Sequence, residues 1–529
     1  MKLRPAALLA LSAGLVASTS TLAQLQIDPV DPVLRAALRR VYPGGGTDTV
    51  GPDVIVGEIQ NSGDCCPDSE TTGISPSATL GSIVAYGLGT SSCNIGSMNV
   101  TWVSLSPNHP IIPQNMYRLE TVNGSTRLEM LGQSWSKYAF TALTFNVCNV
   151  GCNGQGGPVL GVGCSDPYTA GRNATQSSAG PRYECNPFTG VFPDSSAVRA
   201  AWPAASTSVH RRLQVNTSDI STAAHPSALF FGECIYITGD DARYGNGKNN
   251  ASYRRFTVGA GNSITLQGGI GGNGTQRMKP AIYAWQANGL GIGVADPNVM
   301  ISDVAPPQLF SPPSGLPQGD GWLYVGSKAT SIGGGIWHYE FAVENLNSDR
   351  GVASFRVNLP AGAIVSNAEM KQALCHSGAA AADASRNAPW TQAINSDNIT
   401  WTSSNTWNVA LPQQGSYIRW GTLCNFRFDC NIAPVNNGSV TMAYFKPDAS
   451  GPASINATAW TPSLVPTNCY PNCDGSAAAP VLNANDFQCF MNKFAAADSY
   501  ANCDGSTSVP ILNAGDFQCY LNAFALGCT

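Results

Sequence analysis

Short runs that alternate apolar and polar residues recur along the chain and constrain its fold more than any other feature. Examples are DVIVGEIQ (53–60), NVTWVSLS (99–106) and KPAIYAWQ (279–286), and clusters of Gly, Pro, Asn and Ser separate such runs at short intervals. An alternation of period two places successive side chains on opposite faces of a β-strand. Many short strands joined by turns are typical of β-sandwiches. The sequence therefore predicts a mainly β protein.

The chain, at 529 residues, is too long for one hydrophobic core and is expected to form two or three domains. We expect a disulfide-bonded all-β domain at 53–304 and a second β-sandwich domain at 322–460. The Pro- and Gly-rich segment 305–321 and the segment 461–468 are predicted linkers. The predicted fold class is thus two β-sandwich-like domains followed by a small α-helical domain with duplicated calcium loops at 469–529.

The amino-terminal residues have the pattern of a targeting segment. Lys2 and Arg4 precede an apolar run (6–17), and small residues follow it, which indicates a secretory signal peptide over 1–23. The apolar run is too short to span a membrane. A leader segment (24–52) separates it from the first strands. We therefore expect a secreted, soluble protein without a membrane span, extracellular or attached to the cell surface.

Seventeen cysteines in an exported chain are expected to form disulfides. An even group can pair within itself, whereas the odd middle group should leave one thiol free or paired elsewhere. The adjacent Cys65 and Cys66 are expected to bond to separate partners, with Cys93 as a candidate. The groups contain eight, three and six cysteines, at 65–234, 375–430 and 469–528.

The last sixty residues contain the same motif twice, and the two copies align without gaps. Each copy starts with NCDGS and continues through DFQC into an apolar stretch whose aromatic residues are spaced three and four apart, which predicts a loop followed by a helix. Oxygen-bearing residues at alternate loop positions, a Gly and a later carboxylate resemble the calcium loop of EF-hands. The predicted ligands of two Ca²⁺ ions are Asn472, Asp474, Ser476 and Asp486 in the first copy and Asn502, Asp504, Ser506 and Asp516 in the second.

The duplicated NCDGS…LNA.DFQC unit also resembles GC-type dockerin domains, found at the carboxyl termini of exported, often planctomycete, proteins. The resemblance covers about 465–529 and implies two calcium ions and a cohesin-like or other surface protein receptor. Asn502 to Asp516 spans fifteen positions rather than twelve, and few ligands are charged, so calcium should bind in the range of about 10⁻⁴ to 10⁻³ M. Alternatively, Asp486 and Asp516 are simple helix N-caps, and disulfides hold the tail. The disulfide candidates there are Cys469, Cys473, Cys489, Cys503, Cys519 and Cys528.

The body of the chain contains few catalytic signatures. G-x-S-x-G, H-E-x-x-H and zinc-type cysteine spacings are absent, and the five histidines are not spaced as metal ligands. The G-x-G-x-x-G match at 269–274 lacks the strand–helix context of a nucleotide site and is interpreted as a turn. Glu340 and Glu344 share one strand face in WHYEFAVEN but lie roughly 13 Å apart, too far for a glycosidase pair. We expect both to face solvent, opposite Tyr339 and Phe341.

One loop of the body, within 237–255, concentrates polar side chains between Gly residues after a predicted strand. It could bind calcium, or contact a sugar through its amides and its tyrosine. The alternative is an ordinary Asn-Gly turn. The candidate ligand residues are Asp240, Asp241, Tyr244, Asn246, Asn249 and Asn250.

These features favour an exported, non-catalytic, β-rich binding or structural surface protein, attached through its tail. The alternative is a secreted polysaccharide-active enzyme carried by the tail, because dockerins accompany carbohydrate degradation. An open cleft with two carboxylates at glycosidase separation would support the enzyme, and a flat or filled surface the binding protein. The net charge of -5 argues against nucleic acid as a partner, and polysaccharide is the expected ligand class.

Overall fold

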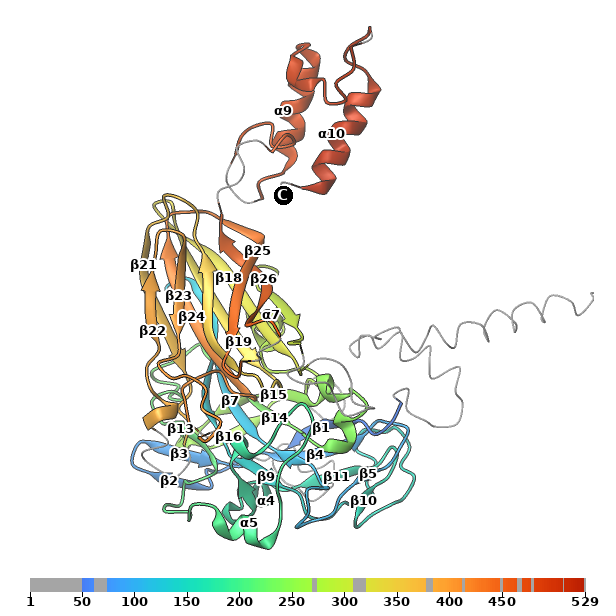
Figure 1. Cartoon of the computed structure of the whole chain (residues 1–529), viewed down its shortest axis with the longest axis vertical. Coiled ribbons are helices and arrows are strands. Elements are labelled where there is room, and N and C mark those ends of the chain that lie inside the picture. The colour runs from blue at the N-terminus through green and yellow to red at the C-terminus, as the bar shows by residue number, and fades with distance from the viewer. Residues whose placement is uncertain are drawn as a thin grey trace, which may run out of the picture.

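The computed structural model describes residues 50–60, 74–268, 274–307, 320–376, 384–411, 414–447, 451–463, 469–476, 480–507 and 509–527. Over these residues the protein is mainly β, with several sheets, as the alternating runs predict (Figure 1). Among them no helix is long and apolar enough to cross a membrane. The predicted signal peptide, almost all of the leader, Cys65, Cys66 and most of both linkers lie outside the described residues.

The first large sheet is antiparallel and has the strand order β16-β15-β14-β7-β8. A two-residue turn, Asn123-Gly124, joins β7 to β8, and both residues have positive φ, as this type of hairpin requires. The strands are β7 (Gln114–Val122), β8 (Ser125–Gln133), β14 (Leu229–Ile235), β15 (Ala251–Val258) and β16 (Ile264–Leu266).

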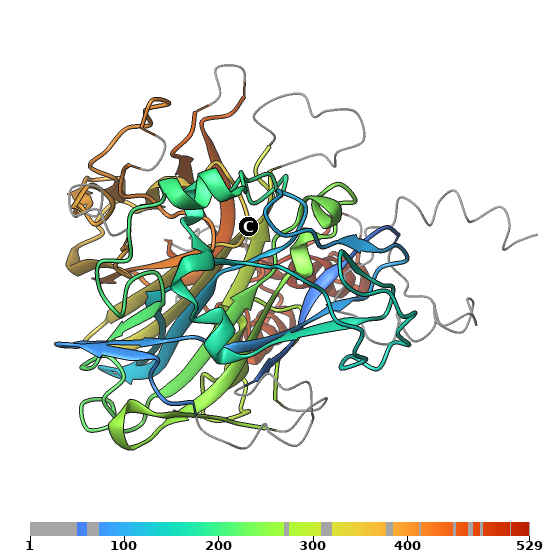
Figure 2. The same cartoon turned by 90° about the horizontal axis from the view of Figure 1, so that it is seen from below.

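Smaller sheets and short helices pack against this first sheet, at the end of the molecule opposite the tail (Figures 1 and 2). Met116 and Phe230 of the large sheet share a hydrophobic cluster with Val84 and Val215 of the small ones. The small strands are β1 (Val54–Gln60), β2 (Ala78–Leu80), β3 (Ile83–Tyr86), β4 (Gly89–Asn94), β5 (Val100–Thr101), β6 (Ile111–Ile112), β9 (Ser136–Tyr138), β10 (Val159–Leu160), β11 (Ser165–Tyr168), β12 (Ala179–Gly180) and β13 (Leu213–Asn216). The short helices are α4 (Ala170–Asn173), α5 (Ser196–Ala201) and α6 (Gly239–Ala242), with 3-10 turns at η2 (Gln176–Ser178), η3 (Arg182–Glu184), η4 (Gly247–Asn249) and η5 (Ala260–Asn262).

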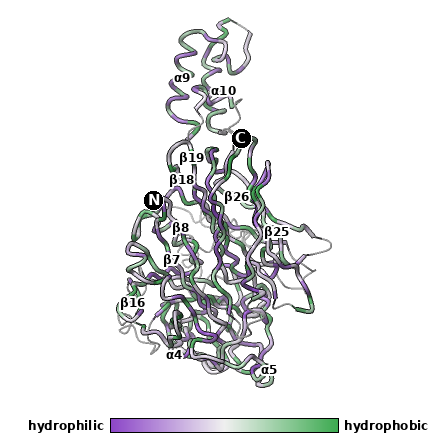
Figure 3. The backbone as a smooth tube through the Cα atoms, turned by 90° about the vertical axis from the view of Figure 1, so that its left-hand side faces the viewer, coloured by the Kyte–Doolittle hydropathy of each residue, from purple (hydrophilic) through white to green (hydrophobic). Residues whose placement is uncertain are grey.

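Two further five-stranded sheets form a β-sandwich. Tyr339, Phe341 and Val343 face its core, as the alternation predicts, and pack against residues such as Phe355 and Trp401 of the opposite sheet. Figure 3 shows hydrophilic and hydrophobic residues alternating along the strands. The central sheet contains β17 (Met300–Val304), β18 (Leu323–Gly333), β19 (Ile336–Asn345), β24 (Thr422–Cys430) and β21 (Val365–Gln372). The outer sheet contains β22 (Thr391–Ile394), β23 (Asn398–Thr402), β20 (Val352–Asn358), β25 (Pro434–Tyr444) and β26 (Ser454–Pro462).

The second face of the central sheet is also covered, because the first sheet packs against it, chiefly through β8. Tyr117 and Met130 share a hydrophobic cluster with Ala342 and Leu423. Arg127 of β8 pairs with Glu340 of β19 at 3.2 Å, and Glu340 and Glu344 are both fully buried. The prediction that these two glutamates face solvent is therefore wrong. Strand period assigns them to the face away from the sandwich core, and the first sheet buries that face.

The run 279–286 was predicted to be a strand, but this prediction is wrong. The run leads into helix α7 (Tyr283–Asn288). Pro280 precedes the helix, and Trp285 is fully buried in the cluster between the first and the central sheet. Its indole Nε1 donates to the Thr126 hydroxyl of β8 at 3.1 Å. Burial of this large ring at the junction explains why tertiary packing overrides the alternating pattern.

Among the described residues of the first region, two disulfides are formed, Cys93–Cys148 and Cys152–Cys164. The prediction that Cys93 bonds to Cys65 or Cys66 is thus wrong. The middle group contributes three free thiols rather than one, and the first group does not pair entirely within itself. Four of the free cysteines are buried and pack as small apolar side chains. The free cysteines of the described chain are Cys185, Cys234, Cys375, Cys424 and Cys430.

The tail forms two loop–helix units, with helices α9 (Ala484–Ala495) and α10 (Ala514–Leu526) and the 3-10 turn η6 (Ser499–Ala501), beyond the end of the second sandwich (Figure 1). Phe490 and Tyr520 are fully buried and stack with ring centroids 4.0 Å apart, so the aromatic faces of the two repeats form one small core. Each loop is bonded to its own helix, by Cys473–Cys489 and Cys503–Cys519. Cys469 is also disulfide-bonded, whereas Cys528 lies outside the described residues.

Candidate functional site

The two acidic residues that end the tail loops are held by backbone N–H groups at the helix starts. Asp486 is fully buried and accepts hydrogen bonds from the N–H of Asn483 at 2.9 Å and of Asp474 at 3.2 Å. Asp516 repeats both contacts, with the N–H of Asn513 at 2.8 Å and of Asp504 at 3.2 Å. The N-caps themselves are Asn483 and Asn513, and each Asp is the third residue of a capping box. The alternative that Asp486 and Asp516 are N-caps is therefore wrong in detail.

The first residue of each loop presents a buried oxygen without a donor. Asn472 Nδ2 donates to the Ser476 carbonyl at 3.0 Å, and Asn502 Nδ2 to the Ser506 carbonyl at 3.0 Å. Both amide groups thereby turn their Oδ1 atoms inward, and neither Oδ1 atom accepts a hydrogen bond from the described chain. A buried acceptor left unsatisfied costs about 1–3 kcal/mol. The same arrangement occurs in both repeats.

The remaining predicted ligands lie in the same loops or at the first turn of the helix that follows each loop. The backbone N–H of Ser476 donates to Asp474 Oδ1 at 2.8 Å and lowers the pKa of Asp474. Burial acts to raise the pKa of Asp516, but the N–H groups of Asn513 and Asp504 outweigh it and the pKa is lowered. The hydroxyl of Ser506 donates to the Ile511 carbonyl at 2.8 Å and accepts from Asn513 Nδ2 at 3.5 Å, so one lone pair remains available. Each loop thus offers two carboxylates and neutral oxygens, a donor set that suits Ca²⁺.

The polar loop of the body does not form one site from all six predicted residues. Asp240 Oδ2 accepts the Thr101 N–H at 2.7 Å, and Asn246 Nδ2 donates to the Pro52 carbonyl at 2.7 Å. Tyr244 is 45% exposed, and its hydroxyl donates to the Met98 sulfur at 3.3 Å. These three residues attach the loop to neighbouring segments. The other three, Asp241, Asn249 and Asn250, are buried together beside Asp53, which the sequence did not single out.

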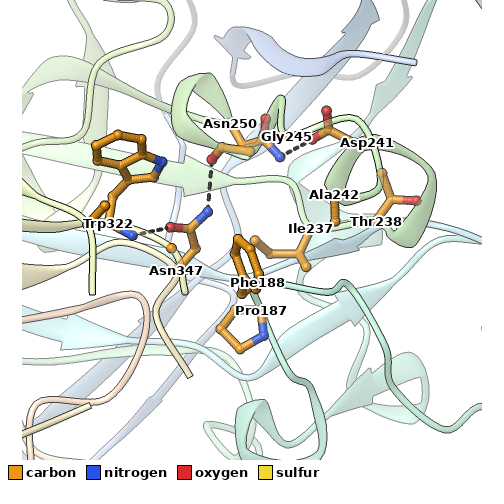
Figure 4. A pocket seen from close by; sticks show the side chains of 13 residues that line it. Pro187, Phe188, Ile237, Thr238, Asp241, Ala242, Gly245, Asn250, Trp322 and Asn347 are labelled. Carbon is orange, nitrogen blue, oxygen red and sulfur yellow. Dashed lines mark hydrogen bonds between the residues drawn. The ribbon is translucent and has the colours of Figure 1, made fainter. Parts of the chain in front are cut away.

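A small cavity lies next to this loop, where the first region meets the second sandwich (Figure 4). Asn347 closes one side, with its Nδ2 donating to the Gly247 carbonyl at 3.0 Å and its Oδ1 accepting the Trp322 N–H at 2.9 Å. The cavity has a volume of about 100 Å³, well below the roughly 300–1,000 Å³ of typical small-molecule pockets. It is lined by Phe188, Ile237, Asp241, Asn250, Trp322 and Asn347, among others.

A pair of carboxylates, Glu233 of β14 and Glu344 of β19, lies at the junction of the first and central sheets. Both are fully buried. Glu233 accepts from Asn115 Nδ2 at 2.8 Å and from the Tyr117 hydroxyl at 3.0 Å, and the Ala281 N–H donates to its other oxygen at 2.6 Å. Burial raises the pKa of both glutamates, and their mutual repulsion raises that of Glu344 further. Glycoside hydrolysis needs carboxylates that reach a substrate, and this pair is closed to solvent.

Sequence motifs and comparisons assign no further site. Most of the Gly-rich match at 269–274 lies outside the described residues. His109 pairs with Asp194 at 2.9 Å, and His338 pairs with Asp429 at 2.6 Å and with Glu340 at 3.3 Å. Within the described chain no three His, Cys, Asp or Glu side chains cluster as metal ligands, so any cation there must also use neutral oxygens. No protein-family model matches the chain, and no curated protein matches its sequence significantly.

Proposed function

We propose that the chain is an exported, non-catalytic, β-rich surface protein whose tail binds two Ca²⁺ ions and attaches it to a protein receptor. The observation that carries this proposal is the unsatisfied amide oxygen buried in each tail loop, at Asn472 and Asn502, in a loop that also contributes two carboxylates. One cation per loop would meet that oxygen and balance the carboxylates. The disulfides of the body and tail support export.

The tail also has a surface suited to a receptor. Met491 and Leu521 occupy equivalent positions of the two repeats, and they are 36% and 45% exposed. Phe487, one turn before Met491 on α9, is 39% exposed. Apolar side chains exposed at equivalent positions of two repeats give a near-symmetric face that a cohesin-like or other surface receptor can cover. Calcium would fix the loops from which both helices start.

The body serves in this proposal as the binding or structural module, with polysaccharide as the expected ligand class. A polysaccharide-active enzyme needs two carboxylates in an open cleft. Among the described residues, the close pair Glu233–Glu344 is fully buried, and the cavity beside Asp241 is too small for a sugar chain. These observations favour the hypothesis of a non-catalytic protein over that of a polysaccharide-active enzyme.

The test counts calcium ions by isothermal titration of the full chain and of an Asp474→Asn, Asp504→Asn double variant. Both carboxylates are exposed and outside the capping boxes, so the variant should fold. We expect it to bind two ions fewer than the wild type, with dissociation constants of about 10⁻⁴ to 10⁻³ M for the lost sites. Asp498→Asn, on a tail carboxylate outside both loops, is the matched control. Equal ion counts in the wild type and the double variant would refute the proposal.

Attachment is tested on producing cells. EDTA should release the wild-type chain from the cell surface, whereas the double variant should appear in the medium without EDTA. Recovery of both proteins inside the cells would overturn the assignment to the surface.

A further inference from the structure

A second group of oxygens is buried in the body, where the start of β1 meets α6 and η4. Asp53 and Asp241 are fully buried, and Asn249 and Asn250 are 4% and 2% exposed. Asp53 reaches the group from a segment almost two hundred residues earlier in the chain. None of the four lies in the tail, so the proposed attachment does not account for them.

The two amides of the group both direct their nitrogen atoms to acceptors. Asn249 Nδ2 donates to the two Asp53 carboxylate oxygens, at 3.1 and 3.3 Å. Asn250 Nδ2 donates to the Tyr236 carbonyl at 2.8 Å and to Asp241 Oδ2 (Figure 4). The amide oxygens must then point the other way. Asn249 Oδ1, Asn250 Oδ1 and Asp241 Oδ1 are all buried and accept no hydrogen bond from the described chain.

The group is rich in acceptors and short of positive charge. Burial raises the pKa of Asp241, and the carboxylates of Asp53 and Asp240 raise it further, while hydrogen bonds from Asn250 and the Val54 N–H offset only part of the rise. Asp240 already accepts a hydrogen bond from the Thr101 N–H. Lys248, which precedes Asn249 in the chain, pairs with Asp303 at 2.8 Å and so does not neutralise the buried carboxylates. A proton on Asp241 would relieve the repulsion but would supply only one donor. It would leave two buried amide oxygens unsatisfied, which is unfavourable.

We propose that Asp53, Asp241, Asn249 and Asn250 bind a divalent cation, Ca²⁺ by the chemistry of the ligands. Hard carboxylate and amide oxygens in an irregular arrangement suit Ca²⁺ better than Mg²⁺, which requires a near-ideal octahedron. A bound cation supplies the positive charge that these buried oxygens lack. Asp241 and Asn250 also line the cavity of Figure 4, which gives the ion a route and room for water ligands. The bound ion joins β1 to the loop that forms the cavity wall.

The first test needs no substitution in the body. The full chain carrying Asp474→Asn and Asp504→Asn is equilibrated with ⁴⁵Ca²⁺, and the bound ions are counted after gel filtration. We expect one ion per chain, and we expect EDTA to lower the Tm of this protein by at least about 3 °C. No bound ion together with an unchanged Tm would overturn the proposal.

The second test locates the ion. Asp241→Asn in the same background keeps the shape of the side chain and should abolish both the bound ion and the effect of EDTA. Asp240→Asn, on the adjacent residue, should preserve both. If Asp241→Asn keeps the ion, the assignment to this cluster is wrong.

The two proposals fail in different ways. Three ions in the wild type and one in the tail variant support both. One ion in each protein refutes the tail sites alone, and two in the wild type with none in the variant refutes the body site alone.

Discussion

Glu344→Gln should stabilise the protein increasingly as the pH rises. Glu344 and Glu233 are fully buried and lie close enough to share a proton. The Ile282 N–H, at 3.3 Å, donates to Glu344 Oε2, while Glu344 Oε1 has no partner in the described chain. Gln has the same shape, always provides the N–H donor that the shared proton now provides, and does not titrate.

The magnitude follows from proton linkage. Burial raises the pKa of Glu344 well above its usual range, so the folded chain keeps a proton that the unfolded chain releases above about pH 4.5. Unfolding then releases a proton, and the free energy of unfolding falls by about 1.4 kcal/mol per pH unit until the folded pKa is reached. Replacing Glu344 removes that slope. Between pH 5.5 and 7.5 the variant should therefore gain stability relative to the wild type, with an upper limit of about 3 kcal/mol for one proton over two pH units.

Urea unfolding followed by tryptophan fluorescence at pH 5.5, 6.5 and 7.5 measures this gain. Glu129→Gln is the control, because Glu129 is also buried, and Lys371 and Arg427 outweigh burial and lower its pKa to about 2, so that it stays ionised across this range. Its carboxylate pairs with Arg118 at 2.9 Å and Arg427 at 2.9 Å. The control should lose about 3–5 kcal/mol at every pH, since it leaves two buried guanidinium groups short of a partner. A constant difference between Glu344→Gln and the wild type across the range would refute the shared proton.

Three further predictions concern packing and reactivity. Alkylation of the native protein at pH 8 should label the half-buried Cys375 but not Cys424, whose pKa burial raises to about 12; mass spectrometry that finds Cys424 labelled before denaturation would contradict this. Phe490→Ala should lower the unfolding free energy of the tail by about 3–5 kcal/mol, because the ring is fully buried, and calorimetry should show the body transition unchanged. Gly132→Ala should destabilise the body by about 1–3 kcal/mol in urea unfolding, since its Cβ would lie 1.9 Å from the Gln214 carbonyl oxygen; an unchanged midpoint would show that β8 moves freely.

Local patterns in the sequence predicted the structural features that depend on residues close together in the chain. The alternation in WHYEFAV assigned Tyr339 and Phe341 to one buried face, and the tail motif located two loop–helix units with a shared aromatic core. In both cases the residues that decide the structure lie within a few positions of one another. The unsatisfied oxygens of Asn472 and Asn502 also belong to the short loops that the motif marked.

Contacts between segments far apart in the chain could not be predicted from local sequence patterns. The alternation of the strand predicted on which face of β19 Glu344 lies, but it could not show that the first sheet covers this face. Its partner Glu233 lies on another sheet, and no sequence motif near Glu233 predicts the contact. Asp53 is likewise separated by 196 residues from Asn249, its hydrogen-bond partner. The helix α7 was missed because the burial of Trp285 at the junction, not local propensity, determines that segment.

The contact between β8 and β24 also has a consequence for the order of folding. Glu129 of β8 pairs with Arg427 of β24, 298 residues later in the chain. At a synthesis rate of about 5–20 residues per second, β8 is complete roughly 15–60 s before β24. Throughout that interval the side of β8 that the central sheet later covers stays uncovered, and apolar surface exposed in this way promotes aggregation. The charges of Arg127 and Glu129, which later form the buried ion pairs, oppose premature strand pairing while the nascent chain awaits its partner.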